Sequence, residues 1–94
     1  MDLVKGYVVG SEYYEEVVYF ENTAENIASF IVNNFMNKCI VTDLADTLIV
    51  NSMVGGYIDT CPNQEYLIKE LHPAIIPMQL GEIEPKNIKF IERD

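Results

Sequence analysis

The stretch Asn22–Phe35, which reads NTAENIASFIVNNF, is the clearest structural signal in the chain. Apolar residues recur through it at helical spacing, namely Ala24, Ile27, Ala28, Ile31, Val32 and Phe35. Asn22 and Glu25 match a capping box, in which the first side chain accepts from a first-turn amide and the second reaches back. The pattern therefore predicts an amphipathic helix, capped by Asn22 or Thr23, with its apolar stripe buried against a sheet.

Segments of strand composition flank this helix. Leu3–Val9 is rich in β-branched residues, and Tyr13–Phe20 alternates with a period of two, so the two predict a hairpin. A helix is the competing interpretation of Tyr13–Phe20, because some of its apolar residues also fit helical spacing. After the helix, Cys39–Thr42 and Thr47–Val50 predict a second hairpin around a short loop.

The second half of the chain is punctuated by glycine and proline. Gly55-Gly56 predicts a tight turn joining Leu48–Val54 to Tyr57–Thr60, so valine at both positions should destabilise the fold. Pro62 fits the first turn of a helix that runs to about Leu71. Because Pro73 disfavours helix at His72, Ala74–Leu80 is expected to be extended, at most an edge strand. Asn87–Ile91 alternates like a last strand.

These elements give the order β-β-α-β-β-β-α-(β)-β. With 94 residues, of which 49% are apolar, the chain has the size and composition of one domain spanning residues 1–94. The expected class is α+β, as a two-layer fold with a mostly antiparallel sheet and two helices on one face.

Charge narrows the range of partners. The formal net charge is −9, and nine carboxylates lie between Gly6 and Ile68 against one base, Lys38. Nucleic-acid phosphates and anionic lipids would be repelled by this part of the chain. Direct nucleic-acid binding and membrane binding are therefore excluded as expected functions, whereas a basic protein partner fits.

Cysteine usage and the N-terminus indicate the compartment. No basic start precedes a long apolar run, and no apolar run approaches the ~20 residues that cross a bilayer, so a cytoplasmic protein is expected. Cys39 and Cys61 are 22 residues apart and form no Cys-x-x-Cys pair. They are expected to be reduced thiols that behave as small apolar groups.

Three places in the sequence carry side chains that are suited to chemistry. Cys61 precedes Pro62 near a predicted helix N-terminus, where the helix dipole would favour a reactive thiolate. Asp43 and Asp46 share one loop but have too few companions for a calcium site, so their role is expected in the turn. His72 has no ligands at metal spacing and is expected to cap a helix end. The expectation is no cofactor, no metal and no catalytic set.

One cluster points toward binding. It combines carboxylates with tyrosines, and its members are Glu12, Tyr13, Tyr14, Glu15 and Glu16. If this segment is a strand, one of the two tyrosines points away from the core, beside carboxylates. Exposed tyrosine is enriched among the residues that dominate binding energy, although ordinary cross-strand packing explains the pattern equally well.

The expected function is a non-enzymatic, acidic protein-protein interaction domain. A sharper version is an inhibitor or regulator of a basic, nucleic-acid-handling protein. The alternative is a homo-oligomeric structural or ligand-sensing domain, in which apolar residues of the 74–80 stretch form a homodimer interface: Ile75, Ile76, Met78 and Leu80. A small enzyme that uses Cys61 is the hypothesis with the least support from the sequence.

Overall fold

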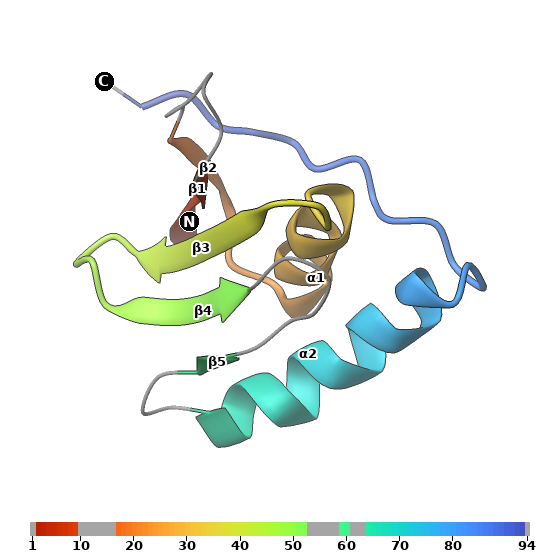
Figure 1. Ribbon diagram of the computed structural model, residues 1–94. Coiled ribbons are helices and arrows are strands. Elements are labelled where there is room, and N and C mark those ends of the chain that lie inside the picture. Colours follow the sequence, from red (N-terminus) through yellow and green to blue (C-terminus); the bar gives the residue numbers. More distant parts are fainter. Residues whose placement is uncertain (1, 10–16, 53–58, 61–63, 94) are drawn as a thin grey trace.

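The computed structural model describes residues 2–9, 17–52, 59–60 and 64–93, with backbone alone for 59–60 and 64–68 (Figure 1). Its elements are β1 (Leu3–Val9), β2 (Val18–Glu21), α1 (Ala24–Asn33), β3 (Lys38–Asp43), β4 (Leu48–Ser52), β5 (Asp59–Thr60) and α2 (Gln64–Gln79). The order β-β-α-β-β-β-α agrees with the expected one up to α2. The Gly55-Gly56 turn and the Pro62 helix start lie outside the described residues.

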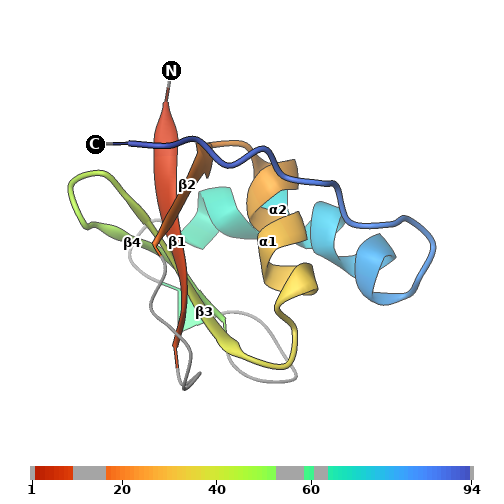
Figure 2. The ribbon, with the colours of Figure 1, turned by 90° about the horizontal axis from the view of Figure 1, so that it is seen from above.

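The five strands form one sheet in the order β2-β1-β3-β4-β5, and every neighbouring pair is antiparallel. Both helices lie on the same side of this sheet, as Figure 2 shows with the sheet seen along its edge. The predicted α+β class and antiparallel sheet are confirmed. β5 pairs with β4 through Val50 and Thr60, so the two segments that the glycine turn was expected to join are neighbours.

Thr23 is the residue that caps α1. Its Oγ1 accepts a hydrogen bond from the backbone N–H of Asn26 at 3.1 Å. Asn22 instead donates its side-chain amide to the Asp2 carboxylate at 3.0 Å. Glu25, the exposed acid of the first turn, lies where a negative charge favours the helix dipole.

The apolar stripe of α1 is buried over most of its length. Ile27 and Ile31 are core residues, as predicted, and Ala24 is partly buried against the core. Phe35 was expected in the core but is 43% exposed, because the helix ends at Asn33 and Phe35 lies in the turn that follows. Phe30, only 4% exposed, is the aromatic residue that α1 buries.

Close packing of two rings explains the glycine in the middle of β1. Phe20 and Phe30 stack at 5.3 Å between ring centroids, directly over Gly6. A Cβ at Gly6 would lie 2.9 Å from Phe20 Cε1 and 2.9 Å from Phe30 Cζ, closer than carbon atoms pack. The missing side chain lets α1 approach the sheet at this position.

The expected edge strand at Ala74–Leu80 is wrong. Helix α2 continues through Pro73 and Pro77 to Gln79. Its buried residues recur at helical spacing, with Leu71, Ile75 and Met78 in the core, while Pro73 is exposed. Burial of this apolar face against the core offsets the hydrogen bonds that the prolines cannot donate.

The expected last strand at Asn87–Ile91 is also wrong. Residues 80–93, called the C-terminal segment below, carry no strand and run beside α1 toward β2 (Figures 1 and 2). Two backbone amides hold the segment: Lys86 N–H donates to Ser29 Oγ at 2.9 Å, and Ile91 N–H donates to the Tyr19 carbonyl at 2.7 Å. Because β2 is an edge strand, the segment covers one free edge of the sheet.

Candidate protein-interaction surface

The face of the sheet that points away from the helices carries a contiguous group of apolar residues. Val4, Val41 and Phe20 are fully buried on the helix side, so their neighbours along β1, β3 and β2 point outward. The apolar residues of this outer sheet face are Leu3, Tyr7, Val9, Tyr19 and Ile40. None of them packs against the hydrophobic core.

Strand register brings these residues together. Tyr7 lies directly opposite Ile40, and Tyr19 lies in one row with Lys5 of the neighbouring strand. A solvated face of an antiparallel sheet normally carries polar side chains. Here large apolar and aromatic groups stand side by side and partly exposed, with Val9 39% exposed. Contiguous exposed apolar surface is common at the interaction sites of proteins.

The same face holds half of the chain's six bases. Lys5 hydrogen-bonds the Asp46 carboxylate, and this bond raises the pKa of Lys5. Lys38 pairs with Val9 in the β1–β3 ladder, at the opposite end of β3 from Asp46. The Arg93 guanidinium stacks over the Tyr19 ring at 5.2 Å from its centroid, a cation–π contact.

The loop between β3 and β4 is built by its aspartates. Asp43 Oδ1 accepts from the backbone N–H groups of Ala45, at 2.9 Å, and Thr47, at 2.8 Å. Asp46 takes a left-handed backbone conformation, with φ of 64°. This is the turn chemistry expected from the sequence. Among the described residues, no three potential metal-binding groups lie together.

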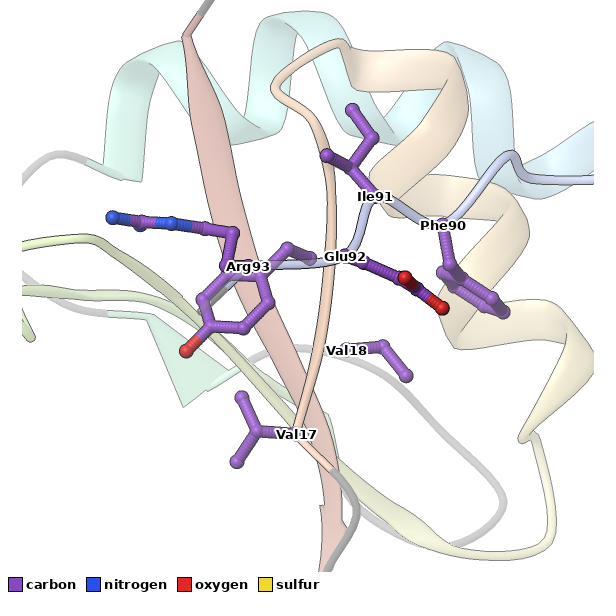
Figure 3. A pocket seen from close by; sticks show the side chains of 7 residues that line it. Val17, Val18, Phe90, Ile91, Glu92 and Arg93 are labelled. Carbon is purple, nitrogen blue, oxygen red and sulfur yellow. The ribbon is translucent and has the colours of Figure 1, made fainter.

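An open groove of 330 Å³ lies between β2 and the end of the C-terminal segment (Figure 3). Val17, Val18, Phe90 and Ile91 supply its apolar wall, and Glu92 and Arg93 its charges. In Figure 3, Phe90 and Arg93 extend to opposite sides of β2. The groove therefore borders the outer sheet face at Arg93.

The residues singled out from the sequence fall into different environments. The acidic tyrosine cluster, Glu12–Glu16, and Cys61 lie outside the described residues. Of the expected oligomer residues, Ile75 and Met78 are core residues of α2, so they present no surface, whereas Ile76 and Leu80 are 40% and 68% exposed.

His72 was expected at a helix end. It lies in the middle of α2 instead, because the helix continues past Pro73. Its side chain is exposed.

Cys39 is a buried thiol on the helix side of β3. Its Sγ lies 3.6 Å and 3.7 Å from the carbonyl oxygens of Asn34 and Asn37. Burial raises the pKa of Cys39, only partly opposed by a hydrogen bond with Ser52. The thiol is packed in the core as the small apolar group that the sequence predicted.

The outer sheet face was missed from the sequence, although a signal was present. In Leu3–Val9 both alternating sets contain large apolar residues, with Leu3, Tyr7 and Val9 in the outward set. A strand that is apolar on both faces indicates cover on both faces.

Comparison with protein-family models, with curated proteins and with solved structures finds no match to this chain. In the part of the chain that the structure describes, no helix has the length and apolar character to cross a membrane.

Proposed function

We propose that this chain is a non-enzymatic protein-interaction domain and that the outer sheet face is its contact surface. The observation that carries the proposal is the row of partly exposed apolar residues on the side of the sheet that has no helix. Covering these residues would remove apolar area from water, which is the main favourable term in protein association.

The centre of this face has the composition of a binding hot spot. Tyr7 and Ile40 face each other across β1 and β3, two inner strands of the described sheet. An aromatic ring next to a branched side chain offers a large contact area at a small cost in conformational entropy. Lys5 and Lys38 flank the pair and supply polar groups for the rim.

Affinity capture from the source cell, followed by mass spectrometry, tests this proposal. The bait is used as the parent chain and as Tyr7→Ser and Ile40→Ser. Ile76→Ser is the matched control, because Ile76 is 40% exposed on α2, away from this face. We expect both outer-face variants to lose a captured protein that the control retains, with the urea midpoint confirming that each variant folds. Retention by all variants would contradict the proposal.

A second candidate function is an inhibitor or regulator of a basic, nucleic-acid-handling protein. The net charge of −9 favours it, as does the run of carboxylates and tyrosines that directly precedes Val17 in the chain. Carboxylates at the rim of an interface mainly speed the encounter with a basic partner, and an aromatic anchor slows dissociation.

Binding kinetics separate these two contributions. Reversal of Glu12, Glu15 and Glu16 to Lys should slow association and weaken its dependence on salt. Tyr13→Ala or Tyr14→Ala should raise the dissociation rate, depending on which ring contacts the partner. If none of these changes alters binding to the captured protein, this cluster is not the contact surface, and the outer sheet face remains the candidate.

A further inference from the structure

We infer that the outer sheet face packs against the same face of a second copy of this chain, about a two-fold axis that lies across the strands. This inference rests on the proposed function, because it names the protein that covers the outer sheet face. It would make the chain a homodimer built through its sheet.

The charge distribution favours a second copy of this chain as the protein that covers the outer sheet face. Each copy carries a net charge of −9, so two copies repel each other over most approaches. The outer sheet face carries Lys5, Lys38 and Arg93, half of the bases of the chain, beside the carboxylates of Glu21 and Asp46, so it adds little to this repulsion. A strongly basic partner would meet those three cations on this face and would be drawn to the rest of the surface instead.

The two ends of β3 carry opposite charges, and these charges favour one direction of the two-fold axis relative to the strands. Lys38 begins the strand, and the loop that follows its end carries Asp46, whose side chain is 78% exposed although it bonds Lys5. A two-fold axis across the strands reverses the strand direction and brings Lys38 of one copy to Asp46 of the other. Symmetry makes this contact twice. An axis along the strands would instead bring the two Lys38 side chains together.

The same axis places the apolar centre of one copy on that of the other. It crosses β3 near its middle, so Ile40 and the adjacent Tyr7 lie close to it in both copies. Two stacked sheets pack ~10 Å apart with interdigitating side chains, which is the arrangement that these residues allow.

The size of the face sets the expected affinity. The five strands have 7, 4, 6, 5 and 2 residues. At about 3.4 Å per residue and about 4.8 Å between strands, they cover roughly 390 Å² per copy, or about 800 Å² for the pair. This is at the lower end for specific interfaces, where complexes are weak and transient. We therefore expect a dissociation constant in the micromolar to millimolar range rather than a permanent dimer.

Sedimentation velocity of the full chain at low salt, over about 1 μM to 1 mM, tests the inference. We expect the parent chain to move from monomer to dimer within this range. Lys38→Glu alone places Glu opposite Asp46, and Asp46→Lys alone places Lys opposite Lys38, so each should raise the dissociation constant by about 10-fold or more. An equimolar mixture of the two variants restores both contacts and should dimerise like the parent.

Lys69→Glu and Glu70→Lys are the matched controls, since they make the same charge changes at exposed positions of α2. They should leave the dissociation constant unchanged, alone and mixed. A parent chain that is monomeric throughout, or a mixture that does not recover, overturns the inference. If the chain is monomeric but Tyr7→Ser still abolishes capture of another protein, only the inference fails, and the proposed function stands.

Discussion

The burial of two phenylalanines, one on α1 and one just after it, differs from what helical periodicity alone predicts. Phe30 is 4% exposed and Phe35 is 43% exposed. Phe30→Ala should lower the free energy of unfolding by about 3–5 kcal/mol, because it removes a ring from the core. Phe35→Ala serves as the paired control and should change it by less than about 1 kcal/mol. Urea unfolding of the two variants gives both values, and equal losses would contradict the placement of Phe30.

Gly6 tests how closely α1 approaches the sheet. Gly6→Ala should destabilise the fold by about 1–3 kcal/mol, since its Cβ would press against the rings of Phe20 and Phe30. Adding Phe30→Leu makes room for that methyl group, so the double variant should lose less stability than the sum of the two single variants. Simple additivity in urea unfolding would show that the methyl group meets no ring.

Because the Cys39 thiol is buried, the stability of the fold should depend on pH. Burial raises the pKa of this thiol in the folded state, so the folded chain keeps a proton that the unfolded chain loses above about pH 8.5. The free energy of unfolding should therefore fall as the pH rises past this value. Urea unfolding of Cys61→Ala should show a steeper fall than Cys61→Ala/Cys39→Ala. Identical pH profiles would contradict a raised pKa at Cys39.

Among the elements, α2 differs most from its expected form, and Pro73 allows a direct test. Pro73 is exposed in the middle of the helix, where proline is about 3 kcal/mol less favourable than alanine. Pro73→Ala also raises the conformational entropy of the unfolded chain, and this lowers the free energy of unfolding by up to about 1 kcal/mol. We expect a net gain in stability of about 1–2 kcal/mol.

Pro85→Ala is the control for this measurement, because Pro85 lies in the C-terminal segment outside any helix. It should give no comparable gain in the urea midpoint. A loss of stability with Pro73→Ala would favour the extended conformation that the prolines suggest in isolation.

For the molecule as a whole, charge predicts no affinity for duplex DNA or RNA at physiological salt. The net charge is −9, and the four bases of the last third of the chain do not form one patch. Lys69 lies on α2, whereas Arg93 stacks on Tyr19 at the outer sheet face. Fluorescence anisotropy with a random duplex should show no binding at micromolar protein. Micromolar binding that disappears on Arg93→Glu would overturn this expectation.

Local patterns determined the type and order of most elements in this protein. Helix α1, the β3–β4 hairpin and its Asp43 turn follow from periodicity, capping and turn chemistry, which act between residues close in sequence. The antiparallel α+β class follows from the order of these elements. The acidic composition likewise predicts that the chain does not bind nucleic acid.

Only the tertiary structure determined the conformation of the second half of the chain. The prolines of α2 predict an extended segment, but burial of Leu71, Ile75 and Met78 outweighs the lost backbone bonds. The last residues lie along α1 and the edge of β2 instead of forming a strand. The outer sheet face exists only once register places Tyr7 beside Ile40, because alternation shows which residues share a face but not which strands are neighbours.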